Sequence, residues 1–122
     1  MGKHNIKSPK HLDFVRSFPC IVCQNEGLGE TPANAHHLTV HPFTKQKTGM
    51  GQKLDDWFTI PLCELHHQGN MVGYTQSGEV ALHKDTPKFE KRYGKEVFLY
   101  QQFMLDNGIE LPDFYPWSLE DI

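Results

Sequence analysis

The feature that most constrains the fold is a pair of short metal-ligand motifs set far apart in the chain. Two residues separate Cys20 from Cys23, and Cys63 and His66 repeat this spacing after a gap of 39 residues. Two such pairs supply the four ligands of a tetrahedral zinc site, and one ion held by both closes a long loop. The pattern uses all three cysteines of the chain. We therefore predict a closed, structural Zn²⁺ site, the alternative being buried thiols beside an ordinary histidine.

The composition is that of a soluble globular protein. Hydrophobic residues make up 38% of the chain and charged residues 22%, which argues against disorder. No apolar run approaches the ~18 residues that cross a bilayer, and no hydrophobic leader follows the first residues. We therefore expect a single domain over residues 1–122, a cytoplasmic location and no membrane partner.

The charge is unevenly distributed. The net charge is -3, but the last 17 residues contain five acids and no lysine or arginine, so the preceding residues carry +2. Three lysines in a polar central stretch, Lys45, Lys47 and Lys53, are candidate contacts to DNA phosphates. Ordinary solvated lysines are the alternative.

Helix and strand signals alternate along the chain, which predicts an α+β fold. Ser8 followed by Pro9 reads as a helix cap with proline in the first turn, and Thr86 followed by Pro87 repeats the signal. Residues 108–122 lack periodicity and could dock on the domain, on a second copy or on a partner. The other expected elements are a helix over 8–19, a tight cysteine turn at 20–23, strands over 36–40 and 57–60, a helix beginning within 61–67, a flexible insertion or hairpin at 68–80 and helices within 86–107.

Four further histidines form a second candidate site. His67 directly follows the predicted ligand His66, and His36 and His37 lie between the two ligand pairs, so closing the zinc site would bring the three within reach of one another. His83 follows the insertion. Several neutral imidazoles suit a divalent metal that keeps open positions for water and phosphate. The alternative is four histidines exposed on loops.

These residues together resemble the HNH endonuclease family, also called the ββα-metal or His-Me finger family. The similarity is strongest to phage recombination-enhancement nucleases that act with the RecA recombinase, and it covers about residues 12–105. The motifs that carry it are Cys20-x2-Cys23, Ala35-His36-His37, Gly49-Met50-Gly51-x-Lys53, Asp56, Ile60-Pro61-Leu62-Cys63-x2-His66-His67 and Leu82-His83-x-Asp85-Thr86-x2-Phe89-Glu90-x2-Tyr93-Gly94.

The resemblance implies a small ββα-metal core with a zinc-knuckle scaffold and flanking helices. In that family a β-hairpin and a helix hold one catalytic divalent ion against the scissile phosphate. Carried onto this chain, His37 becomes the general base and Asp56 the residue that orients it. His36, His67 and His83 become the ligands of the catalytic ion, which can be Mg²⁺, Mn²⁺ or Zn²⁺.

Three alternatives stay open within this resemblance. Asp56 stands where relatives usually have asparagine, and Asp55 is an equally near candidate. The roles of His36 and His37 can be reversed, because neighbouring strand residues point to opposite faces. Fifteen residues separate His67 from the next histidine where relatives have about three, so the intervening insertion must loop out.

The activity implied by the resemblance is metal-dependent hydrolysis of DNA phosphodiester bonds with little sequence specificity, leaving 5′-phosphate and 3′-hydroxyl ends. It would serve phage or prophage recombination or repair, with DNA and a RecA-type recombinase filament as partners. A zinc-stabilised nucleic-acid or protein-binding module without catalysis is the main alternative. A hydrolase acting on another substrate is a third possibility.

Overall fold

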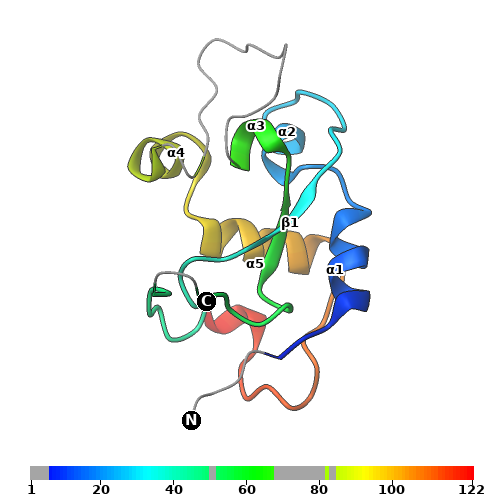
Figure 1. The fold of residues 1–122 in the computed structure, drawn as a ribbon, viewed down its shortest axis with the longest axis vertical. Helices are drawn as coiled ribbons and strands as arrows, with labels where there is room; N and C mark the ends of the chain where they lie inside the picture. Colours follow the sequence, from blue (N-terminus) through cyan, green and yellow to red (C-terminus); the bar gives the residue numbers. More distant parts are fainter. Residues whose placement is uncertain (1–5, 50–51, 68–81, 83–84) are drawn as a thin grey trace.

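The fold is a two-stranded sheet surrounded by short helices (Figure 1). The structure is a computed structural model, and it describes residues 6–49, 52–67, 82 and 85–122. No helix in this described part is long and apolar enough to cross a membrane. The elements in chain order are α1 (Pro9–Arg16), α2 (Ile21–Asn25), β1 (Asn34–His37), β2 (Thr59–Leu62), α3 (Glu64–His67), α4 (Thr86–Tyr93), α5 (Glu96–Asp106) and the 3₁₀ helix η1 (Leu119–Asp121).

Strands β1 and β2 pair antiparallel, with His36 opposite Ile60 and His37 opposite Thr59. Both strands lie away from the ranges expected from the sequence. β1 begins and ends earlier than 36–40, and β2 begins and ends later than 57–60. Strand β2 includes Pro61, a residue that lacks a backbone N–H. In a sheet of only two strands one backbone edge needs no partner, so a proline is tolerated within β2.

Helix α1 begins at the predicted cap, since the Ser8 hydroxyl accepts a hydrogen bond from the backbone N–H of His11 at 3.3 Å. Helix α4 differs from the expectation. Its cap is Asp85, whose side chain accepts from the N–H of Lys88 at 3.1 Å, while Thr86 is the first helical residue. The expected tight turn at the first two cysteines is the five-residue helix α2.

One hydrophobic cluster joins the sheet, α1, α2 and the long helix α5. All four residues of β2 are buried, α5 packs against this strand, and Tyr100 and Met104 of α5 are fully buried in the same cluster. In Figure 1, α2 and α3 lie together at one end of the sheet and η1 lies toward the other end. The sheet therefore connects the two ends of the molecule.

The C-terminal residues dock on the domain itself. Leu119 is buried, and its carbonyl accepts a hydrogen bond from Gln101 of α5 at 3.0 Å. The ring of Trp117 stacks on Phe43 with centroids 4.9 Å apart. Of the three alternatives for this segment, the structure shows the first. The expected insertion at 68–80 lies outside the described residues.

Candidate metal centre and histidine site

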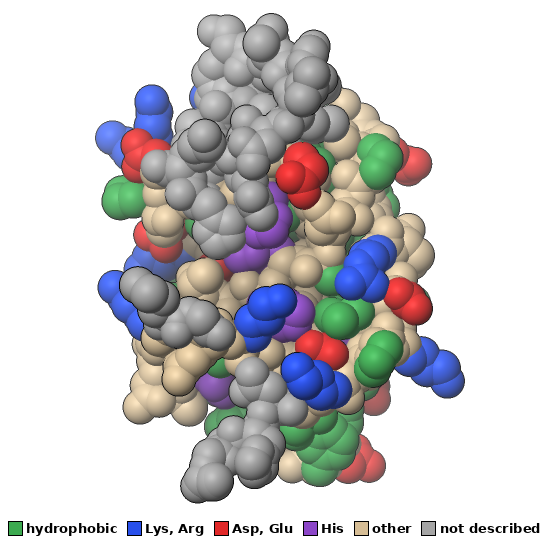
Figure 2. All heavy atoms as spheres, in the orientation of Figure 1, with side chains coloured by type: hydrophobic (Ala, Val, Ile, Leu, Met, Phe, Trp, Pro, Cys, Tyr) green, Lys and Arg blue, Asp and Glu red, His purple; other side chains and the backbone are tan. Residues whose placement is uncertain are grey.

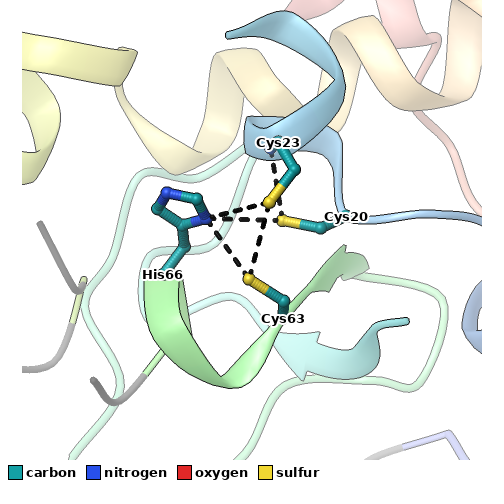
Figure 3. A group of neighbouring side chains, drawn as sticks. All are labelled: Cys20, Cys23, Cys63 and His66. Carbon is teal, nitrogen blue, oxygen red and sulfur yellow. Dashed lines mark hydrogen bonds between the residues drawn. The ribbon is translucent and has the colours of Figure 1, made fainter. Parts of the chain in front are cut away.

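The four predicted zinc ligands converge in one buried cluster. Cys20 caps α2 and Cys23 lies within it, Cys63 lies between β2 and α3, and His66 lies in α3. Their ligand atoms all lie within 4.8 Å of one another, and no side chain is more than 1% exposed. Figure 3 shows the three sulfurs and the Nδ1 atom of the imidazole pointing toward a common centre. This group can bind a metal ion such as zinc.

The spacing of these atoms fits a tetrahedral ion. Zn–S bonds of about 2.3 Å and Zn–N bonds of about 2.1 Å place two sulfurs about 3.8 Å apart, and a sulfur and a nitrogen about 3.6 Å apart. The Sγ atoms of Cys23 and Cys63 are 3.7 Å apart. His66 Nδ1 lies 3.8, 3.4 and 3.3 Å from the sulfurs of Cys20, Cys23 and Cys63. The donor set, three thiols and one imidazole, is a structural zinc set.

Local hydrogen bonds hold the two halves of the cluster. In the first half, the Sγ of Cys20 accepts from the N–H of Cys23 at 3.5 Å, as in a helix cap. In the second half, the N–H of His67 donates to the carbonyl of Cys63 at 2.8 Å, which places His66 one helical turn after that cysteine. The short helices therefore place the ligands by backbone geometry.

The thiols of this cluster strongly influence one another's ionisation. A hydrogen bond from Cys20, helped by His66, lowers the pKa of Cys63 to about 4 although burial opposes the change. The same hydrogen bond, together with burial, raises the pKa of Cys20. Several buried thiolates repel one another, so a bound cation is what would let all three ionise together.

The second candidate site lies beside the first, because His67 follows His66 in α3. Nε2 of His67 is 3.1 Å from Nδ1 of His36 on β1. Two nitrogens that bind one ion at about 2.1 Å with an angle of roughly 90–110° are separated by about 3.0 to 3.4 Å. His36 is 3% exposed. These two imidazoles therefore fit as neighbouring ligands of one divalent ion.

His37, the last residue of β1, contacts a carboxylate instead. Its Nε2 lies 2.8 Å from Oδ1 of Asp56, and the other oxygen of this carboxylate accepts from the N–H of Ser8 at 2.7 Å. Burial raises the pKa of Asp56, but these two hydrogen bonds and nearby Lys7 outweigh burial and lower it. The carboxylate is therefore held ionised beside the imidazole.

Asp55 has other partners, which come from the N-terminal and C-terminal parts of the chain. Its Oδ1 accepts from the N–H of Ile6 at 3.0 Å, and its Oδ2 accepts from the hydroxyl of Tyr115 at 2.6 Å. Of the two neighbouring aspartates, Asp56 is the one that contacts the strand histidine.

The predicted phosphate-binding lysines differ in their surroundings. All three are exposed, but the ammonium group of Lys45 donates to the carbonyl of Pro42. Lys47 pairs through its backbone with Val40 in an isolated β-bridge. Figure 2 shows histidine side chains reaching the surface in the middle of one face, with positively charged side chains beside them. His83 lies outside the described residues.

Glu96 is a buried charged residue that sequence reasoning missed. It is the first residue of α5, and its Oε2 lies 3.0 Å from Nε2 of His36. Burial raises the pKa of Glu96, but hydrogen bonds from His36 and Thr39 outweigh burial and lower it. The available signal was an acid opening an apolar helical run, which reads equally well as an ordinary helix N-terminus.

Comparison with known proteins gives the family. The family described as "Protein of unknown function (DUF968)" matches residues 2–111, which is most of the chain. The chain belongs to the DUF968 family. The DUF968 match includes the cysteine cluster, both strand histidines and Glu96.

A relative shares part of this DUF968 sequence. Uncharacterized protein YdfU of Escherichia coli (strain K12) is 33% identical over 95 residues, which cover 78% of this chain and 21% of the relative. The chain thus matches about one fifth of the length of that curated relative. No solved structure matches this chain.

Proposed function

We propose that the chain is a metal-dependent endonuclease of the HNH type that hydrolyses DNA. The observation that carries the proposal is the pairing of two adjacent strand histidines with two different kinds of partner. His36 faces the imidazole of His67 at 3.1 Å, while His37 faces the carboxylate of Asp56 at 2.8 Å. A metal ligand pair beside an oriented general base is what phosphodiester hydrolysis requires.

The arrangement of elements supports the same proposal. Two antiparallel strands are followed directly by a helix, and the histidines lie on the first strand and on that helix. The buried cysteine cluster ties α2 to α3 and so fixes the helix against the strands. In the proposed ββα-metal core, the cluster is the scaffold and the neighbouring histidines do the chemistry.

The proposed base has a defined reacting atom. The ionised carboxylate of Asp56 accepts the Nε2–H of His37, which leaves the lone pair on Nδ1 of this imidazole free to take a proton from water. A divalent ion held by His36 and His67, with His83 as the third ligand that the HNH resemblance implies, would stabilise negative charge on the phosphate oxygens. The carboxylate keeps the imidazole in one orientation, so the entropy cost of orienting the base is not added to the activation barrier.

DNA is the proposed substrate because the histidines lie on a face with positive charge. Lys47 and Lys53 are exposed, and Lys7 lies near Asp56. Contacts from such side chains to phosphates are independent of sequence and weaken as salt concentration rises. We propose low sequence specificity and, following the resemblance, action together with a RecA-type filament.

The first experiment is cleavage of supercoiled plasmid and of single-stranded circular DNA, with and without a RecA filament. Metal-stripped protein that has been given back one zinc is assayed with Mg²⁺, Mn²⁺ or added Zn²⁺. Wild type is expected to nick DNA, and His37→Ala is expected to lose about 10² to 10⁴ of the rate, the usual contribution of a general base.

Two neighbouring aspartates provide a matched control. Asp56→Ala removes the acceptor that holds the imidazole of His37, and we expect a slower reaction. Asp55→Ala makes the same chemical change at a side chain that contacts Ile6 and Tyr115 instead, and we expect near wild-type cleavage. Absence of cleavage by wild type in every arm, with zinc still bound, would reject the nuclease and favour a zinc-stabilised binding module.

A further inference from the structure

We propose that Glu96 is a positioning residue that fixes which nitrogen of His36 faces a metal ion. The proposal rests on the proposed histidine metal site. Glu96 lies 60 residues from His36 in the sequence, yet its Oε2 is 3.0 Å from Nε2 of that imidazole. Both side chains are buried, with only 3 to 4% of either exposed.

The two oxygens of Glu96 have separate partners. Oε1 accepts three hydrogen bonds: from the N–H of Thr39 at 2.5 Å, from its hydroxyl at 2.7 Å and from the N–H of Val40 at 3.0 Å. These bonds tie the start of α5 to the chain just beyond β1. Oε2 is therefore held toward His36 by a carboxylate that is already anchored.

This anchoring determines the tautomer of the imidazole. An ionised carboxylate can only accept, so the Nε2 of a neutral His36 must carry the hydrogen. The lone pair is then on Nδ1, the atom that lies 3.1 Å from Nε2 of His67. A carboxylate that orients a histidine ligand in this way typically raises metal affinity 10- to 100-fold.

Replacing Glu96 with glutamine changes which nitrogen of His36 carries the hydrogen, while the shape of the side chain stays almost the same. Glutamine has one acceptor oxygen, and the three donors from Thr39 and Val40 occupy its position. The side-chain NH₂ then faces Nε2 of His36 and donates to it, so the imidazole hydrogen moves to Nδ1. A protonated Nδ1 cannot bind a metal ion.

The test uses the full chain with one zinc bound and two measurements. The first is ¹⁵N NMR of the imidazoles, in which wild-type His36 is expected to carry its hydrogen on Nε2 and Glu96→Gln is expected to carry it on Nδ1. The second is titration with Co²⁺, followed by its visible absorption. We expect 10- to 100-fold weaker Co²⁺ binding by Glu96→Gln.

Two controls separate this role from a structural one. Thr39→Val removes one donor to Oε1 but leaves the contact of Glu96 with His36, so the tautomer and the Co²⁺ affinity should stay near wild type. Glu26→Gln repeats the chemical change at a partly exposed glutamate that lies 3.9 Å from Arg92. It should change neither measurement.

The outcomes distinguish this proposal from the proposed function. If wild-type His36 carries its hydrogen on Nδ1, the role of Glu96 is rejected without any variant. If Glu96→Gln binds Co²⁺ as wild type does and keeps its tautomer, Glu96 is not a positioning residue, while the metal site stands. If wild type binds no second metal, the proposed nuclease site fails, and the tautomer alone decides the role of Glu96.

Discussion

His66 and His67 are neighbours in one short helix, but they belong to regions built on different physical principles. His66 closes a cluster of four ligands in which every donor is buried and each faces the others. His67 faces His36, which in turn contacts a buried carboxylate from another helix. The first region is closed and complete, whereas the second depends on partners from several parts of the chain.

In the proposed function, the first region stabilises the fold and the second carries out the reaction. A four-ligand zinc site has no open position and contributes to folding directly. The histidine region instead places two polar pairs at the end of β1, one between two imidazoles and one between an imidazole and a carboxylate. The N–H of Ser8 and the carboxylate of Glu96 contact one member of each pair. Disturbing the first region should unfold the protein, and disturbing the second should leave it folded.

The strongest test of this comparison is removal of the metal. Structural zinc contributes of order 10 kcal/mol to small metal-dependent domains. A strong chelator is therefore expected to abolish the cooperative unfolding transition, as followed by circular dichroism together with zinc content. Adding back one equivalent of Zn²⁺ should restore the transition. A metal-free protein that still unfolds cooperatively at the same denaturant concentration would show that packing alone holds the fold.

A smaller effect is expected from changing the two neighbouring histidines one at a time. His66→Ala removes one ligand from the cluster but leaves the three cysteines, so it should weaken zinc binding and lower the free energy of unfolding by roughly 3 to 5 kcal/mol. His67→Ala makes the same truncation one residue later and should keep the zinc, with a loss within about 1 kcal/mol. Chemical denaturation and metal analysis of both variants measure the contrast. Equal losses would contradict the division into two regions.

The cysteine cluster could be predicted from the sequence because its ligands come in close pairs. A spacing of two residues is a local property, and short helices such as α2 place both donors of a pair by backbone geometry alone. The cap of α1 at Ser8 was equally local. The range predicted for β2 was wrong. A proline is tolerated in a sheet with a free edge, and the number of strands in a sheet is not a local property.

The surroundings of the histidines could not be predicted in the same way. Glu96 reaches His36 across 60 positions, and Tyr115 reaches Asp55 across a similar separation. Neither pair has a characteristic spacing, since each depends on how α5 and the C-terminal segment pack on the sheet. The choice between Asp55 and Asp56 likewise needed the structure, because both precede the same strand.

The smallest expected effect is the loss of stability in acid that comes from the buried residue His11. Burial lowers the pKa of His11 from 6.5 to about 4, although nearby Asp56 acts in the opposite direction. His11 stacks on Trp57 with ring centroids 3.9 Å apart, next to the aspartate that contacts His37. Between pH 6.5 and 4 the unfolded chain binds a proton at His11 that the folded chain does not. Stability is therefore complete above pH 6.5 and falls as the pH drops toward 4.

His11→Phe keeps an aromatic ring on Trp57 and removes the titration. From pH 6.5 to 4.5, wild type should lose roughly 1 to 2 kcal/mol more of its free energy of unfolding than this variant. Both proteins contain the same cysteine cluster, so any loss that follows from protonating its side chains cancels in the difference. A difference that stays constant with pH would mean that water reaches His11 in the folded protein. The acid sensitivity of the stability would then not come from His11.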